Sequence, residues 1–174
     1  MKRNKREEIL TAAHELFRER GYASTSMREI AEKVGLLKGS LYSHFTGKED
    51  ILLGVLKGPM NKLVGNLTRV RDSNLPWPEK VRQGILVQFD EPYPSYYAVA
   101  FVILSELYTR PREKRSELIF DFFRHHKEVW IDILQEGVDQ GYTDGSVSAK
   151  TAYFALGGMI NWTYKWYSED GPLT

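Results

Sequence analysis

Apolar residues recur at helical spacing along the chain. Between residues 5 and 20 the apolar face of such a helix consists of Ile9, Ala13, Leu16 and Phe17. No stretch alternates strictly between apolar and polar residues, which is the pattern of a half-buried strand. The sequence therefore predicts an all-α protein.

Capping residues place two short helices after the first one. Ser26 followed by Glu29 has the spacing of a capping box, which predicts a helix over residues 27–34. Gly35 ends this helix, and a third helix is predicted over residues 38–45. Together the first three helices form a predicted N-terminal helix-turn-helix domain.

The rest of the chain divides into longer amphipathic segments. Pro59 lacks a backbone N–H, so we expect it to kink or split the helix predicted over residues 48–72. The later expected helices are residues 78–90, 95–109, 111–140 and 149–167. We therefore expect two domains, residues 1–47 as the helix-turn-helix domain and residues 48–174 as a helical bundle.

Composition narrows the class of protein. The 174 residues are 42% hydrophobic and 27% charged, which is typical of a folded domain. The lack of cysteine excludes disulfides and thiolate metal sites and favours the cytoplasm. No apolar run approaches the roughly 18 residues of a membrane span, and the basic start lacks the apolar stretch of a signal peptide. We expect a cytoplasmic protein without a membrane partner.

The net charge of +1 conceals an uneven distribution. Residues 1–48 hold ten Lys and Arg against six Asp and Glu, whereas residues 49–174 hold fourteen against seventeen. A basic N-terminal region predicts a polyanionic partner at that end, and double-stranded DNA fits a helix-turn-helix. The residues suited to phosphates and base edges are Lys38, Gly39, Ser40, Tyr42, His44 and Lys48.

An ordered series of residues carries a family resemblance. It comprises Ile9-Leu10, Phe17, Gly21, Thr25, Met27, Ile30-Ala31, Val34-Gly35, Gly39-Ser40-Leu41-Tyr42, His44-Phe45 and Lys48-Glu49. The series resembles the DNA-binding region of the TetR family of bacterial transcriptional regulators. The resemblance implies a homodimer that binds a palindromic operator and represses nearby genes until a small molecule binds the C-terminal domain.

The resemblance also implies roles for single residues. Phosphates are expected at Thr25, Tyr42, His44 and Lys48, and bases at Lys38, Gly39 and Ser40. The expected DNA-binding set is completed by Ser26 and Arg28. Leu37 departs from the family, which commonly has a small polar residue there that caps the recognition helix.

Aromatic residues are abundant after residue 48. Such rings form either a core or a ligand pocket between helices, and the core is the ordinary role of any single ring. The candidate ligand-binding residues are Tyr96, Phe101, Leu104, Phe123, Trp130, Asn161, Trp162 and Trp166.

The last segment carries a narrower resemblance. Its residues Gly157-Gly158-Met159-Ile160-Asn161-Trp162, Trp166-Tyr167 and Gly171-Pro172-Leu173 are similar to TetR-family repressors of fatty-acid and steroid-ring catabolism. This resemblance implies an acyl-CoA effector, with a multidrug or other hydrophobic compound as the alternative. The same small residues also suit dimer packing. Family members usually continue with one more helix, so we expect a further helix after Thr174.

The residues do not suggest catalysis. The four histidines lack a carboxylate or second ligand at catalytic or metal spacing, and there is no Gly-rich phosphate loop. We therefore expect no enzyme activity, no metal and no cofactor apart from a small hydrophobic effector. A helical interaction module that does not bind DNA is the remaining alternative.

Overall fold

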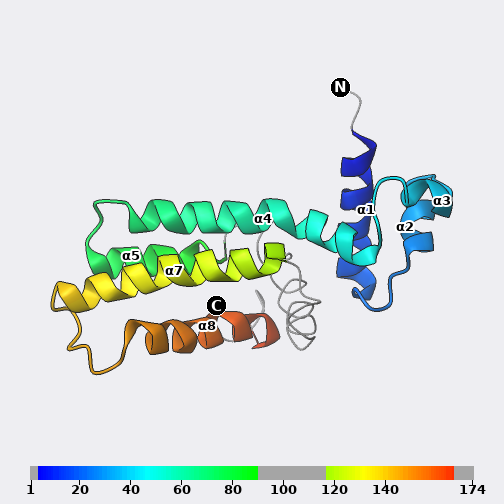
Figure 1. The fold of residues 1–174 in the computed structure, drawn as a ribbon. Coiled ribbons are helices and arrows are strands. Elements are labelled where there is room, and N and C mark those ends of the chain that lie inside the picture. Colours follow the sequence, from blue (N-terminus) through cyan, green and yellow to red (C-terminus); the bar gives the residue numbers. More distant parts are fainter. Residues whose placement is uncertain (1–3, 90–116, 167–174) are drawn as a thin grey trace. The chain divides into compact units, whose positions relative to one another are not determined.

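The computed structural model describes residues 4–89 and 117–166. Over those ranges every regular element is a helix (Figure 1). The helices are α1 (Lys5–Arg20), α2 (Met27–Lys33), α3 (Lys38–Leu41), α4 (Lys48–Arg71), α5 (Trp77–Leu86), α7 (Glu117–Asp139) and α8 (Ala149–Trp166). The predicted all-α class is confirmed, while the helix expected over residues 95–109 lies outside the described residues.

The described residues form two compact units, which we call the N-terminal unit (residues 4–60) and the C-terminal unit (residues 61–89 and 117–166). Helix α4 contributes residues to both units. The contacts thus group the first half of α4 with the preceding helices, whereas our sequence-based division was placed before this helix, at residues 47–48.

The N-terminal unit is built on the apolar face predicted for α1. Its buried side chains include Ile9, Ala13, Leu16, Phe17, Ile30, Leu41, Phe45, Ile51 and Leu52. Helix α1 packs against α2, and α2 packs against α3. Burying a large apolar side chain stabilises a fold by about 1.5–3 kcal/mol, so this shared core holds the short helices that would not form alone.

Local signals set both ends of α2. The capping box is present, because the Ser26 amide donates to the Glu29 carboxylate at 2.8 Å and the Glu29 amide donates to the Ser26 hydroxyl at 3.2 Å. At the other end Gly35 has a φ of +66°, a conformation that glycine adopts without strain. This turn connects α2 to α3.

Of the two outcomes expected at Pro59, a kink or a split, the split does not occur, because helix α4 continues through this residue. Proline removes only one intrahelical hydrogen bond, and buried residues flank it on both sides, Leu56 and Met60 among them. Tertiary packing therefore maintains the helix across the missing bond.

The C-terminal unit packs α5 against α7 and α7 against α8. The indole N–H of Trp77 donates to the carbonyl of Ile133 at 2.8 Å. Gly84 allows the Trp130 ring to approach the α5 backbone, since a Cβ atom at this position would lie 2.7 Å from the ring. Helix α5 ends at Leu86, four residues before the expected end, and the chain continues as a turn.

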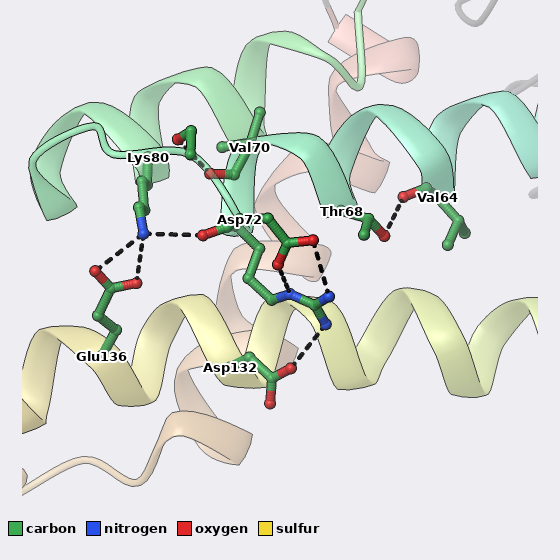
Figure 2. A network of polar contacts seen from close by, with 9 residues as sticks. Val64, Thr68, Val70, Asp72, Lys80, Asp132 and Glu136 are labelled. Carbon is green, nitrogen blue, oxygen red and sulfur yellow. Dashed lines mark hydrogen bonds and ion pairs between the residues drawn. The ribbon is translucent and has the colours of Figure 1, made fainter.

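A polar network links α4, α5 and α7 (Figure 2). The buried ammonium group of Lys80 donates to both carboxylate oxygens of Glu136, at 2.9 and 3.1 Å, and to the carbonyl of Arg71 at 2.9 Å. The guanidinium of Arg71 forms ion pairs with the next residue, Asp72, and with Asp132 on α7. All three donors of the buried ammonium group are thus satisfied.

Helix α8 follows a turn in which Gly141 and Gly145 have positive φ. The predicted cap is present, with the Thr151 amide donating to the Ser148 hydroxyl at 3.2 Å. One side of α8 is exposed although it carries large apolar residues, namely Phe154, Met159 and Trp162. None of the described helices is both long and apolar enough to cross a membrane.

We predict that Glu136→Ala lowers the free energy of unfolding by about 3 kcal/mol, because it leaves the Lys80 ammonium buried without its counter-charge. Urea unfolding monitored by circular dichroism measures this loss. The matched control is Asp121→Ala, which breaks the exposed pair with Arg124 and should cost no more than about 0.5 kcal/mol. Equal effects of the two substitutions would contradict the prediction.

Candidate nucleic-acid interface and ligand-binding unit

Helix α3 and the turn that follows it present a polar face to solvent. Leu41 and Phe45 point into the core, so the residues between and before them face outward. The exposed set is Lys38, Gly39, Ser40, Tyr42 and His44. In the described part of the chain, no hydrogen bond or ion pair occupies the side chains of Lys38, Tyr42 or His44. These three groups therefore remain available to phosphates and base edges.

The α-helix at this face is shorter than predicted. It ends at Leu41 instead of Phe45, and the chain continues as a helical turn in which the His44 amide donates to Leu41 at 3.0 Å. The Ser43 hydroxyl donates to the carbonyl of Ser40 at 2.7 Å, a local bond that competes with the regular helix ladder. At the other end Leu37 provides no side-chain cap, as its apolar side chain requires.

Thr25 does not lie on this exposed face. Its side chain is only 1% exposed, and its hydroxyl donates to the carbonyl of Gly21 at 2.9 Å. The phosphate contact expected for Thr25 stays a prediction, and within the chain this hydroxyl is already bonded. The hydroxyl satisfies a carbonyl at the end of α1 and thereby fixes the loop before α2.

Lys48 is also used internally. Its ammonium group donates to the carbonyls of Tyr22 (2.7 Å), Ala23 (3.2 Å) and Thr25 (2.7 Å), and lies 4.5 Å from the centre of the Tyr22 ring. Partial burial lowers the pKa of this ammonium group. Three acceptors use all three of its donors in this arrangement, and the phosphate contact expected for Lys48 stays a prediction.

The remaining predicted DNA-binding residues lie at the start of α2. Ser26 is exposed but its hydroxyl takes part in the capping box. Arg28 is exposed and pairs with Glu32 at 2.7 Å, an exposed ion pair that a phosphate could replace at small cost. The predicted set thus separates into an unpaired face on α3 and supporting residues around it.

One cation at this interface was not predicted. Arg6 is exposed, and its guanidinium lies 4.3 Å from the centre of the Phe45 ring, beside the turn that follows α3. The basic start of the chain was the only sequence signal for it, because contact with Phe45 depends on the packing of α1.

The candidate ligand-binding residues have different positions. Tyr96, Phe101 and Leu104 lie outside the described residues, as do the side chains of Asn161 and Trp166. Phe123 is half-buried in α7, and Trp162 is 59% exposed on α8. Trp130 is fully buried against Gly84, which supports the core alternative for this ring.

Besides Lys80, two polar side chains of the described residues are buried in the C-terminal unit. His126 on α7 lies between the rings of Phe122 and Tyr153, and burial lowers its pKa to about 4, so it is neutral at pH 7. Gln88 follows α5 and donates to the carbonyl of Gly84 at 3.3 Å. No three His, Asp or Glu side chains among the described residues are placed to hold a metal ion.

Comparison with known families identifies both parts of the chain. A model described as "Bacterial regulatory proteins, tetR family" matches residues 9–55. A model described as "Tetracyclin repressor-like, C-terminal domain" matches residues 78–174. These matches cover the helix-turn-helix and more than half of the whole chain.

Individual relatives match at nearly full length. The HTH-type transcriptional repressor KstR2 of Mycobacterium tuberculosis is 29% identical over 171 residues, which cover 98% of this chain and 85% of that protein. The fatty acid metabolism regulator protein of Bacillus subtilis is 26% identical over 170 residues, covering 97% and 87%.

Solved structures agree with these relatives. AibR in complex with isovaleryl coenzyme A and operator DNA matches with a TM-score of 0.79 and 27% identity, over 98% of this chain and 91% of that one. The structure of the ketosteroid transcriptional regulator KstR2 matches with a TM-score of 0.79 and 27% identity, over 100% and 88%. The chain belongs to the TetR family, whose members are transcriptional regulators and not enzymes.

Proposed function

We propose that this regulator is a repressor that binds a palindromic operator as a homodimer and releases it when an acyl-CoA thioester binds the C-terminal unit. The observation that supports DNA binding is the exposed, unpaired face formed by Lys38, Tyr42 and His44. A bacterial regulator of this kind acts on chromosomal DNA, so we assign it to the cytoplasm.

The α3 face suggests a division of roles at the operator. Lys38, Gly39 and Ser40 stand at the start of the helix and contact base edges in the major groove. Tyr42, His44 and Arg6 contact phosphates. Two such faces in a two-fold dimer require half-sites about 34 Å apart, or one turn of DNA, which explains the palindrome.

The dimer contact is assigned to α8. Its exposed residues Ala155, Met159 and Trp162 recur at intervals of four and three positions and so share one helix face. Large apolar side chains of this kind are normally covered by a partner when they form a continuous patch, and a small residue on the same helix face permits close helix contact. A second copy of the chain is the partner that the family resemblance implies.

The effector class rests on similarity. Relatives of the chain are named a ketosteroid transcriptional regulator and a fatty acid metabolism regulator, and the AibR structure contains isovaleryl coenzyme A with operator DNA. An effector that binds better to a dimer with another half-site spacing weakens DNA binding by linkage, without contact with the DNA surface.

The effector proposal is tested by selecting an operator from a random duplex library and measuring its release by fluorescence anisotropy. We expect a palindromic site, and we expect one or more acyl-CoA esters to weaken binding at least about 5-fold, the lower end of usual coupling. Free coenzyme A and free fatty acids are the controls. Release by drugs or free acids alone would favour the alternative of a general hydrophobic-compound sensor, and failure to select any site would contradict DNA binding.

We predict different consequences for two lysines. Lys38→Ala should weaken operator binding by about 1–3 kcal/mol and relax preference at one base pair per half-site. Lys48→Met should instead lower the free energy of unfolding, because three carbonyls lose their donor. Anisotropy at several salt concentrations and urea unfolding separate the two effects. A stable Lys48→Met protein whose salt slope falls by about 0.9 would show a direct phosphate contact.

The dimer assignment predicts that Met159→Arg raises the monomer fraction in sedimentation equilibrium and weakens operator binding, because a charge would be buried at the contact. Met159 is 64% exposed within the chain, so the fold should tolerate the change. Leu75→Arg, at an exposed apolar position between α4 and α5, is the matched control. An unchanged dimer in Met159→Arg would exclude this face of α8 as the interface.

A further inference from the structure

The C-terminal unit contains two buried polar atoms that lack a hydrogen-bond partner among the described residues. They are Oε1 of Gln88 and Nε2 of His126. Only 3% of Gln88 and 7% of His126 is exposed. Folded proteins pair nearly all such atoms, because an unpaired polar group in the interior loses its hydration without compensation. Each of the two atoms therefore requires an explanation.

The register of α5 against α7 brings the two residues to the same level. The contacts between the helices join Trp77 with Gly137, Lys80 with Glu136, and Gly84 with Trp130. Positions that advance along α5 thus meet positions that recede along α7, so the helices are antiparallel. One turn beyond Gly84 is Gln88, and one turn before Trp130 is His126.

Local contacts fix the orientation of both groups. The amide nitrogen of Gln88 donates to the Gly84 carbonyl at 3.3 Å, which leaves Oε1 as the free acceptor. The Tyr153 hydroxyl lies 3.4 Å from Nδ1 of His126. The half-buried Tyr153 hydroxyl can donate to Nδ1 or accept from it, and donation to Nδ1 leaves the proton on Nε2. The pair then offers one acceptor and one donor.

Among the described residues, the contacts of the pair are aromatic rings and a backbone carbonyl. Rings of Phe122 and Tyr153 contact the imidazole at 5.8 and 6.0 Å between centroids. Desolvation is the cause of the low pKa of His126, so the ring is neutral at pH 7. No Lys or Arg of the described residues forms a bond with Gln88 or His126. A carboxylate placed here would lack a counter-charge, whereas a neutral polar group would not need one.

We propose that Gln88 and His126 form a polar anchor for the neutral hydroxyl or amide group of an otherwise apolar ligand. The group donates to Oε1 of Gln88 and accepts from Nε2 of His126. This anchor rests on the proposed function, in that it assumes a small-molecule effector in the C-terminal unit. Two sources supply the chemistry: a hydroxyl on the apolar part of the effector, or an amide of the pantetheine arm of a coenzyme A ester.

The test is calorimetric titration of the full chain at pH 7.5 with 1-decanol, decanamide and decanoate. We expect 1-decanol or decanamide to bind about tenfold or more tightly than decanoate. Gln88→Leu and His126→Phe should each weaken the neutral probes about tenfold, because each removes one hydrogen bond to the ligand while it retains apolar volume. The matched controls Gln83→Leu on α5 and His125→Phe on α7 should bind the probes as the wild type does.

Coenzyme A esters identify the source of the polar group. A similar loss for decanoyl-CoA and 3-hydroxydecanoyl-CoA in the two variants assigns the anchor to the pantetheine amide, and a loss for the hydroxylated ester alone assigns it to the acyl hydroxyl. Wild-type affinity of both variants for the neutral probes overturns the anchor, as does a wild-type protein that binds no neutral probe. Reduced stability of the variants with unchanged probe affinity also overturns it, since the pair would then hold a structural water.

The anchor and the proposed function fail in different measurements. Operator binding without ligand should be unchanged in Gln88→Leu and His126→Phe. If no coenzyme A ester releases the operator while the neutral probes still bind through the pair, the proposed effector class fails and the anchor stands. If esters release the operator equally well from the wild type and both variants, the effector class stands and the anchor fails.

Discussion

The convergence of three carbonyls on the ammonium group of Lys48 is the constraint on which the N-terminal unit depends. These carbonyls belong to the loop between α1 and α2, and Lys48 is the first residue of α4. One side chain therefore joins three helices that share only a small core. Thr25 acts from within the same loop, where its hydroxyl satisfies the end of α1. The polar face of α3 is presented by a scaffold whose loops are held by hydrogen bonds as much as by apolar packing.

The parts of this structure that could be predicted are those encoded by neighbouring residues. The sequence predicted the capping box of Ser26 and Glu29 and the missing cap at Leu37, because a capping side chain bonds within three residues of its own position. The apolar face of α1 followed from spacing alone. The predicted end of α3 was wrong because the Ser43 hydroxyl competes for a backbone carbonyl of the helix. The spacing of apolar residues does not reveal this competition.

The roles of single site residues were harder to predict. The family resemblance assigned Thr25 and Lys48 to phosphates by position. The ammonium group of Lys48, however, donates to backbone carbonyls more than twenty positions away in the sequence. The polar contact of the His126 ring is with Tyr153, which lies 27 residues further along the chain. Hydrogen bonds of this kind form only through tertiary packing, so a local sequence pattern does not predict them.

The interface between α5 and α7 changes in character along its length. At one end Lys80 and Glu136 satisfy each other fully, and in the middle Gly84 and Trp130 pack without polar groups. At the other end Gln88 and His126 each retain an unused atom. The polar atoms are fully hydrogen-bonded at one end of the interface and only partly at the other. The residues that stabilise the unit thus lie apart from those able to bind a ligand.

Helix α4 has one further consequence. It belongs to both compact units, and its 24 residues correspond to about 36 Å of continuous helix without an intervening linker. Pro59 lies next to the boundary between the units at Met60 and leaves the carbonyl of Val55 without its intrahelical donor. A helix bends most easily where such a hydrogen bond is missing, so α4 resists bending least at the end of the N-terminal unit.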